Sequence, residues 1–279
     1  MATRKPKFTT CSVVIAVYRN DQPDWFYQSI ESILNQTIPS NDIIIVVDGP
    51  IPPPLEQVID IYDRLYSEIT VKKLAENQGA GPARNVGIKL AKNHLIAIQD
   101  ADDISAPERF ALELAELNKN SRLALVGGQL AEFENDNPKN VVSYRHVPLT
   151  YPEIREFARR RMPVNNPTVM FKKTIIRKNG YYGNSNRSED YFLIAKLIKN
   201  NHLILNVPEI AVLYRTNISA FERRKTLKHL IQFISTRQKL CSLGISNVTD
   251  FLIPCAAQLV ITVSPKIMVR TIYRKALRK

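Results

Sequence analysis

The first 120 residues alternate between short apolar runs and longer segments in which apolar positions recur every three or four residues. Four runs are mainly apolar and have the length of buried strands, at residues 11–18, 42–48, 69–74 and 94–100. Four segments have helical spacing and begin at a proline, at residues 23–37, 54–66, 82–93 and from 107 onward. Apolar strands separated by helices predict an α/β fold with a Rossmann-like, mainly parallel sheet and helices on both faces.

The rhythm changes after about residue 121. The segments 123–134 and 141–147 predict antiparallel strands around the turn NDNPKN, and we expect them to form a small antiparallel sheet. Shorter elements follow: a helix at 151–160, a strand at 167–171, a helix at 188–200, and an extended stretch at 203–215 that Pro208 breaks. From about residue 219 the chain is helical and basic. This pattern divides the chain into one domain over 1–218 and a C-terminal extension over 219–279.

The charge of the chain is concentrated at one end. Composition is that of a globular protein, 44% hydrophobic and 23% charged. Residues 221–279 contain twelve Lys or Arg and two acids, so this last fifth carries +10 of the formal +13. Such asymmetry predicts a basic face for an anionic partner, or simply a solvated basic helix. The extension has no known nucleic-acid recognition pattern, so we expect a membrane surface and no nucleic acid.

The last twenty-one residues fit a membrane interface. Residues 259–279 mix nine large aliphatic or methionine side chains with six cations, the composition of a helix that lies along a bilayer surface. The most apolar stretch, 251–264, has an internal Pro254 and is short of the roughly 20 residues needed to span. Three cysteines are widely spaced, and the apolar run SVVIAVY after the basic N-terminus is cut off at once by RNDQPD, so we expect no secretory signal. We expect a cytoplasmic protein attached peripherally to the inner face of the cytoplasmic membrane.

Polar and glycine-rich residues follow all four of the first strands. Tyr18 follows the first strand and Asp48 ends the second. The loop after the third strand reads ENQGAGPARN and contains Arg84. The fourth strand runs into the acidic segment Asp100-Ala101-Asp102-Asp103. Because ligands of open α/β sheets bind outside the carboxyl ends of the strands, these four ends predict a nucleotide pocket.

The segment DADD suits a metal ion shared with a diphosphate. Mg²⁺ or Mn²⁺ usually takes one or two protein carboxylates and completes its shell with phosphate oxygens and water. A calcium loop starting at Asp100 is excluded, because its sixth residue is Ser105 where glycine is needed and its twelfth is Ala111 where glutamate is needed. The segment GAGPAR resembles a dinucleotide fingerprint, but Arg84 occupies the third glycine position, so we expect no nicotinamide or flavin cofactor.

A series of motifs resembles one family. SVVIAVYRND, SIESILNQT, IIIVVDGP, NQGAGPARNVGI, IAIQDADDISAPERF and SEDYFLIAKL occur in the order found in family 2 glycosyltransferases with the GT-A fold. The resemblance covers roughly residues 11–215. It implies an inverting enzyme with a nucleotide-sugar donor and Mn²⁺ or Mg²⁺. It also implies that about 1–120 binds the donor and 121–218 the acceptor.

The resemblance also implies roles for single residues. Tyr18 and Asp48 would contact the nucleobase, and Arg84 would lie near the base or the diphosphate. Asp100 and Asp102 would bind ribose and metal–diphosphate, with Asp102 as the metal ligand. The acid at the start of the helix 188–200 would be the catalytic base, and three more residues would lie on the acceptor side. These four are Asp190 as base, and Asp103, Asn166 and Glu189 towards the acceptor.

Several positions keep simpler interpretations. Glu189 and Asp190 could be first-turn acids of a helix capped by Ser188. Asn166 could cap a loop before Pro167. Asp103 could mainly favour the helix that follows it. The chain also departs from the family pattern, because Val47 stands where an aspartate is usual and no histidine follows Arg215 in the segment YRTN.

The resemblance and the basic extension together predict a hexosyltransferase of bacterial O-antigen, capsule or exopolysaccharide synthesis. A UDP-sugar is the expected donor, with dTDP- and GDP-sugars as alternatives, and a lipid-linked glycan is the expected acceptor. The alternative is a non-catalytic nucleotide-sugar- or membrane-binding module with a vestigial site.

Overall fold

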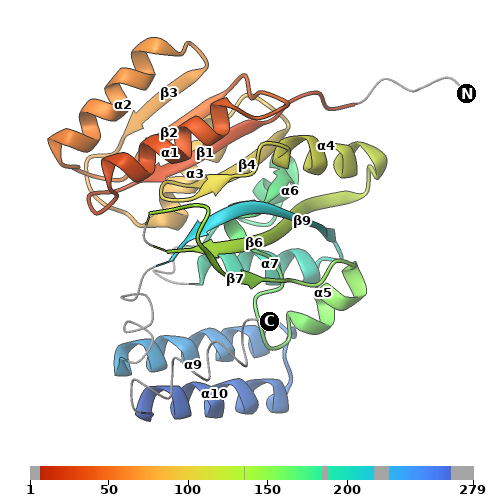
Figure 1. Ribbon diagram of the computed structural model, residues 1–279. Coiled ribbons are helices and arrows are strands. Elements are labelled where there is room, and N and C mark those ends of the chain that lie inside the picture. Colours follow the sequence, from red (N-terminus) through yellow and green to blue (C-terminus); the bar gives the residue numbers. More distant parts are fainter. Residues whose placement is uncertain (1–6, 135, 184–187, 217–225, 265–279) are drawn as a thin grey trace, which may run out of the picture.

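Four parallel strands form the first half of the sheet, in the order β3-β2-β1-β4. The computed structural model describes residues 7–134, 136–183, 188–216 and 226–264 (Figure 1). The strands are β1 (Ser12–Val17), β2 (Ile43–Val47), β3 (Ile69–Lys73) and β4 (Leu95–Asp100). The helices that alternate with them are α1 (Pro23–Leu34), α2 (Pro53–Leu65) and α3 (Ala80–Leu90). The predicted parallel sheet with crossover helices is confirmed.

The second half continues the same sheet. Antiparallel β8 joins β4 to β6, so in the described residues nine strands form one sheet in the order β3-β2-β1-β4-β8-β6-β9-β5, with β7 beside β6. The antiparallel strands therefore extend the main sheet and do not stand apart from it. Their elements are β5 (Ile104–Ser105), α4 (Arg109–Lys119), β6 (Leu123–Phe133), β7 (Val141–Arg145), α5 (Tyr151–Phe157), η1 (Asn166–Thr168), β8 (Met170–Lys172), α6 (Lys173–Lys178), α7 (Glu189–Lys199) and β9 (Leu203–Arg215).

Two details differ from the sequence prediction. β9 runs without a break through Pro208. The ladder to β6 shifts register between Gly127 and Gln129, opposite this part of β9, and the shift accommodates a residue that lacks an N–H. α3 begins at Ala80 and not at Pro82, so the proline lies inside its first turn, where a missing N–H costs little.

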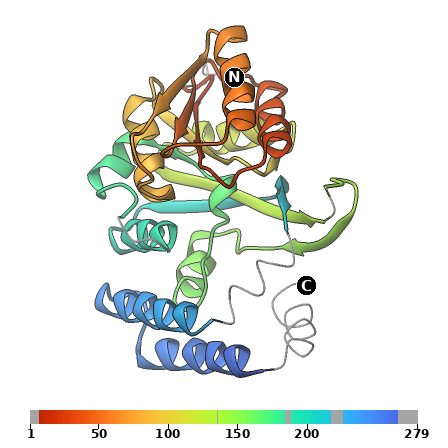
Figure 2. The same cartoon turned by 90° about the vertical axis from the view of Figure 1, so that its left-hand side faces the viewer.

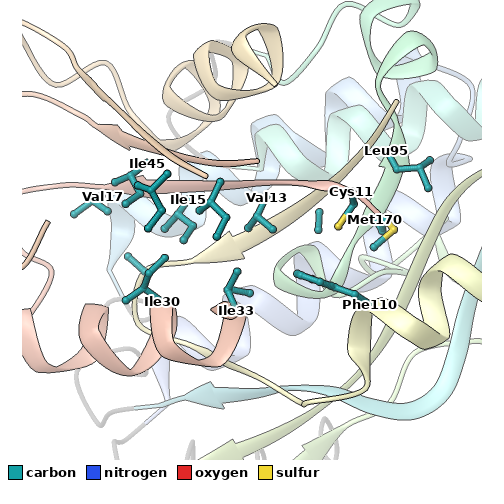
Figure 3. Packing of buried hydrophobic residues seen from close by; sticks show 14 of the residues in the cluster. Cys11, Val13, Ile15, Val17, Ile30, Ile33, Ile45, Leu95, Phe110 and Met170 are labelled. Carbon is teal, nitrogen blue, oxygen red and sulfur yellow. The ribbon is translucent and has the colours of Figure 1, made fainter. Parts of the chain in front are cut away.

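Alternate residues of β1 face opposite sides of the sheet and build two cores. Val13, Ile15 and Val17 pack towards α1 and α4, where Figure 3 shows them above Ile30 and Ile33. On the other face the strands pack against α3, α5, α6 and α7. Burial of both faces explains why β1, β2 and β4 are mainly apolar, whereas β3, at the end of the strand order, carries Lys72 and Lys73.

A helical hairpin forms a further layer. Helices α9 (Leu227–Ser242) and α10 (Val248–Val263) lie below α5 and α7, at the end of the molecule opposite α2 and β3 (Figures 1 and 2). Leu240 of α9 packs against Tyr191 and Phe192 of α7. In the part of the chain that the structure describes, none of the helices has both the length and the hydropathy to cross a bilayer. The predicted domain boundary at 218 and most of the predicted interfacial helix fall outside the described residues.

Candidate active site

The carboxyl ends of β1, β2 and β4 lie at one edge of the sheet. The last residues of β1 and β2 are paired in the parallel ladder, and Ala16 of β1 is paired with Asp100 of β4. Because the strands are parallel, the residues that follow them emerge side by side. The structure thus brings Tyr18, Asp48 and Asp102 to the same edge, as the sequence predicts.

Asp48 anchors the glycine loop between β3 and α3. One of its carboxylate oxygens accepts the N–H of Gln78 at 2.8 Å, and the other accepts the N–H of Gly79 and the side-chain amide of Asn77, both at 2.9 Å. Gly49 has a φ of +83°, and a Cβ there would lie 2.6 Å from the backbone nitrogen of Asn77. Only glycine permits this backbone and this approach. Sequence reasoning missed the anchoring role of Asp48.

Arg84 connects the end of β4 to the start of α7. Its Nη2 donates to Asp100 Oδ1 at 2.7 Å and its Nη1 to Glu189 Oε1 at 3.3 Å. The guanidinium is also 5.7 Å from the ring centroid of Tyr182. Burial opposes the positive charge, yet Asp100, Tyr182 and Glu189 together raise the pKa of Arg84 above its ordinary value. Asp100 and Glu189, which the sequence prediction assigns to the donor and acceptor sides, therefore belong to one cluster.

Asp103 holds the acidic segment to the end of β9. Its side chain is wholly buried, and Oδ1 accepts the backbone N–H of Arg215 at 2.9 Å. Arg215 Nε in turn donates to the backbone carbonyl of Asp102 at 3.0 Å. Burial, with Asp102 and Asp100 close by, raises the pKa of Asp103 well above its ordinary value. These contacts place the side chain of Asp103 inside the protein.

Arg215 is a site residue that sequence reasoning did not select. Its guanidinium lies between the rings of Trp25 and Phe133, 4.9 and 4.7 Å from their centroids. Nη2 donates to Gln28 Oε1 at 2.8 Å, and Nη1 pairs with Asp136. The arginine thus joins α1, β6 and the acidic segment. The sequence carries no local signal for these contacts, because they come from distant segments.

Arg109 binds the residues on both sides of the acidic segment 100–103. It is wholly buried, and its Nη1 donates to Gln99 Oε1 at 3.0 Å and Ser105 Oγ at 2.9 Å. Its Nη2 donates to the carbonyl of Ile98 at 2.8 Å, and its Nε pairs with Glu113 at 3.1 Å. The residues before and after the segment are therefore fixed by one side chain.

Asp21 is another residue near the acidic segment that the sequence prediction did not select. Its Oδ2 accepts the backbone N–H of Tyr18 at 2.9 Å. Burial is the main cause that raises the pKa of Asp21 to about 7, and the charges of Asp102 and Asp100 add to it. Asp21, Asp100 and Asp102 therefore lie close enough for their negative charges to oppose one another.

The two acids that begin α7 have different surroundings. Glu189 pairs with Arg84, and burial together with Asp190 raises the pKa of Glu189. Asp190 Oδ1 accepts the N–H of Tyr191 at 2.7 Å, which suits an acid in the first turn of a helix. Ser188 has a φ of 62° and its side chain does not cap the helix, so that part of the simpler interpretation is wrong.

Asn166 reaches the same network through Tyr182. The hydroxyl of Tyr182 donates to Asn166 Oδ1 at 3.1 Å, and the side chain of Asn85 pairs with the backbone of Tyr182 in both directions, at 2.8 and 3.0 Å. Burial raises the pKa of Tyr182, so its hydroxyl stays protonated and remains a donor. Asn166 is thereby connected to Arg84, which lies over the Tyr182 ring.

A cavity of about 310 Å³ lies between the glycine loop and the start of α7. Gly81 lets the glycine loop approach the start of α7 closely, because a Cβ there would lie 2.9 Å from the carbonyl oxygen of Gly183 and 3.0 Å from Glu189 Cγ. The cavity walls are formed by Asn77, Gln78, Gly79, Ala80, Gly81, Pro82 and Glu189.

The acids at the sheet edge could bind a metal ion only if a diphosphate supplied the remaining metal ligands. Among the residues that the structure describes, no three His, Cys, Asp or Glu side chains are grouped so as to hold an ion by themselves. A divalent ion bound together with a diphosphate needs one or two carboxylates. The carboxylates of Asp21, Asp100 and Asp102 lie close enough at this edge to influence one another, and oxygens of this kind would fit such an ion, for which the sequence prediction names Asp102.

Comparison with known proteins agrees with this geometry. The family model described as Glycosyl transferase family 2 matches residues 12–183. The UDP-Gal:alpha-D-GlcNAc-diphosphoundecaprenol beta-1,3-galactosyltransferase of Escherichia coli is 30% identical over 280 residues, covering 100% of this chain and 99% of that protein. The O-antigen biosynthesis glycosyltransferase WbnJ of Escherichia coli is 29% identical over 243 residues, covering 85% and 91%. The mannosyltransferase PcManGT from Pyrobaculum calidifontis, solved with GDP-Man and Mn²⁺, has the same fold, with a TM-score of 0.61 at 13% identity over 97% of this chain and 81% of that one.

Proposed function

The chain belongs to glycosyltransferase family 2, among the members that act in bacterial surface-polysaccharide synthesis, and from this premise we propose a more specific reaction. The enzyme transfers a hexose from a nucleotide sugar to a hydroxyl of a lipid-linked glycan and inverts the configuration at the anomeric carbon. The observation that carries the proposal is the bridge of Arg84 from Asp100 to Glu189, because it joins the strand-end acids and the acids of α7 in one site.

The donor occupies the carboxyl edge of the sheet. Tyr18 and Asp48 contact the nucleobase, Asp100 contacts the ribose, and Arg84 lies beside the diphosphate. Tyr18 is 40% exposed, and the carboxylate of Asp48 accepts three hydrogen bonds, two from backbone N–H groups and one from Asn77, where a carboxylate can accept about four. A UDP-sugar is supported by the relative named for UDP-Gal, with GDP- and dTDP-sugars as alternatives.

A Mn²⁺ or Mg²⁺ ion would be held by Asp102 together with oxygens of the diphosphate. Such an ion stabilises the negative charge that develops on a leaving nucleoside diphosphate. The excess of carboxylates around Asp21 and Asp100 supports it, as does the Mn²⁺ bound in the mannosyltransferase of similar fold. No histidine follows Arg215, so the protein ligand would be Asp102.

Asp190 is the catalytic base. A sugar hydroxyl is a poor nucleophile, and a carboxylate that takes its proton during attack increases the rate. The hydrogen bond from the N–H of Tyr191 fixes the carboxylate at the start of α7. Glu189 cannot take this role as easily, because Arg84 already engages it. Asn166 and Glu189 face the acceptor side, whereas the burial of Asp103 favours a positioning role for that residue.

The enzyme works as a peripheral protein at the inner face of the cytoplasmic membrane. The +10 charge of residues 221–279 supports this location, because each basic residue near an anionic leaflet contributes about 1 kcal/mol. A lipid-linked acceptor, for which the Escherichia coli galactosyltransferase is named, would be met at that surface.

Thermal unfolding with a panel of UDP-, dTDP- and GDP-hexoses and Mn²⁺ tests donor binding. A bound donor raises the unfolding temperature of the native chain. We expect one UDP-sugar to stabilise the protein most, and chelation of the metal to remove that shift. A shift that persists unchanged after chelation would contradict the metal assignment.

Transfer to lipid-linked acceptors tests catalysis. Asp190→Asn should lower the rate about 10² to 10⁴-fold and leave donor stabilisation intact, as removal of a general base predicts. Glu189→Gln is the matched control, with a smaller loss of rate. Full activity of Asp190→Asn would refute the base assignment, and donor binding without transfer to any acceptor would favour the vestigial module.

A further inference from the structure

Helix α10 places its polar side chains inside and its apolar side chains outside. Asp250 and Gln258 are its buried residues, at 0% and 8% exposure. A helix that faces water normally has the opposite arrangement. At the helical spacing, the strongly exposed apolar residues share one side of α10, and each is more than half exposed: Val248, Leu252, Ile253, Leu259, Val260 and Val263.

The inward carboxylate of Asp250 determines which side of α10 faces out. Its two oxygens accept hydrogen bonds from Arg159 Nε and Arg160 Nε, both at 2.7 Å, next to α5. Burial works against ionisation of Asp250, but these two arginines outweigh it and hold its pKa below the ordinary value. If the helix rotated to turn its apolar side inward, Asp250 would move away from Arg159 and Arg160, and these ion pairs would be lost.

Arg237 of α9 attaches the α9–α10 hairpin to the rest of the protein. Arg237 is 1% exposed, and it donates to the backbone carbonyls of Arg159 and Asp250 and to the hydroxyl of Tyr191. α10 is therefore the outermost layer of the molecule at this end, with α9 and α5 behind it (Figure 2).

The outer side of α10 has the chemistry of a lipid-facing surface. Between residues 248 and 263 the sequence contains one charged residue, Asp250, and that side chain points inward. Single exposed apolar residues are ordinary on a protein surface, but six on one side of one helix are not. The side chains that water meets along this helix are thus almost all apolar.

The sequence that follows α10 favours a lipid as the occupant. Residues 265–279 contain six Lys or Arg and no acid, which suits the anionic headgroups of a bilayer. A second copy of the chain is a less favourable occupant, because its own basic residues 265–279 would repel those of the first copy. A helix of 16 residues is about 24 Å long, less than the roughly 30 Å of a hydrocarbon core, so α10 would lie along the surface.

We propose that the outer side of α10 is inserted at the headgroup–acyl boundary of an anionic bilayer, with the helix axis parallel to the membrane plane. This inference rests on the proposed membrane location. It assigns the membrane contact to α10 as well as to residues 265–279, the basic tail. The apolar side chains provide the insertion, the cations that follow provide the electrostatic attraction, and the Asp250 ion pairs hold α10 in orientation.

Sedimentation with vesicles of phosphatidylcholine and phosphatidylglycerol tests the contact in the full chain. The double variant Leu252→Ser/Val260→Ser removes two outward apolar side chains and should weaken partitioning at least about tenfold. Leu65→Ser is the matched control, because Leu65 is 70% exposed on α2, at the opposite end of the molecule, and its loss should leave partitioning unchanged. Equal binding by the double variant and the wild type would overturn the proposal.

Insertion can also be measured directly. In Ile253→Trp, the emission in excess of that of the wild type, whose single tryptophan is Trp25, should shift to shorter wavelength on vesicles and be quenched by brominated acyl chains. In Leu65→Trp, the corresponding excess emission should respond in neither way. No quenching at position 253, with the protein bound, would assign the membrane contact to the tail and refute the role of α10.

Two further readouts separate the alternatives. If light scattering without vesicles shows a dimer that Leu252→Ser/Val260→Ser converts to a monomer while vesicle binding persists, the occupant is a second copy and the proposal is wrong. Donor stabilisation measured on the same variants is independent of the membrane. Vesicle binding that depends on α10 without stabilisation by any nucleotide sugar supports the inference while the proposed function fails.

Discussion

Arg84 lies between two carboxylates that are 89 residues apart in the chain, with Asp100 at 2.7 Å on one side and Glu189 at 3.3 Å on the other. The arginine side chain is 11% exposed, and those of Asp100 and Glu189 are 25% and 14% exposed. Charges at such positions depend on their partners, because water solvates them poorly. The two sides of the site therefore depend on one guanidinium.

Replacement of Arg84 by Gln should lower the free energy of unfolding by about 2 kcal/mol. The loss is smaller than the roughly 3–5 kcal/mol of a wholly buried pair, because Asp100 keeps some contact with water. Glu189→Gln is the control, since it leaves the shorter pair with Asp100 intact and should cost less than about 1 kcal/mol. Urea unfolding measures both variants, and equal losses would contradict the central role of Arg84.

Asp48→Asn should loosen the glycine loop. The substitution replaces one acceptor oxygen with an NH2 group, which cannot accept a hydrogen bond, so the N–H of either Gln78 or Gly79 loses its acceptor. Hydrogen exchange at these two amides should become faster, while exchange in β2 stays slow. Donor binding should weaken as well. Unchanged exchange with weakened donor binding would show that Asp48 contacts the nucleotide without anchoring the loop.

The pKa of Asp21, raised to about 7, predicts a pH dependence of stability. The folded chain holds this proton more tightly than the unfolded chain, so the contribution is complete below about pH 4 and is lost as the pH rises through 7. Asp21→Asn cannot ionise and can still accept the N–H of Tyr18. In metal-free buffer its unfolding temperature, relative to the wild type, should be higher at about pH 8 than at about pH 5. An equal difference at both values would refute the raised pKa.

Gly87→Ala should destabilise the contact of α3 with the sheet. A Cβ at this position would lie 2.4 Å from Val14 Cγ1, which is closer than side-chain carbons approach. Overpacking of about 1–3 kcal/mol should exceed the gain in helix propensity of about 1 kcal/mol. Val14→Ala in the same chain should restore part of the loss. Gly183→Ala is the control, because no described atom lies within 4 Å of its Cβ.

The parallel half of the fold was predictable because its strands are buried on both faces. β1, β2 and β4 are continuous apolar runs, and prolines mark the helix starts, so local patterns sufficed. The course of β9 was not predictable in this way. Pro208 locally disfavours a strand, and only the irregular pairing with β6 accommodates it.

The candidate site was predictable where it follows strand ends and not where it depends on distant contacts. Asp48, Asp100 and Asp102 stand directly after buried strands, so topology alone brings them together. Arg215 and Arg109 look like ordinary arginines in the sequence, and their roles come from contacts with residues up to 187 positions away. Burial also cannot be read locally, which is why Asp103 was expected on the acceptor side.

The contact between Arg237 and the hydroxyl of Tyr191 joins α9 to the residue that follows Asp190. If α10 rests on a bilayer, this contact holds the carboxylate of Asp190 at a set height above the lipid headgroups. The distance between the bilayer surface and the catalytic carboxylate would then be fixed. Only a sugar that stands at that height above its lipid anchor could be extended, so acceptor length would be selected along with acceptor chemistry.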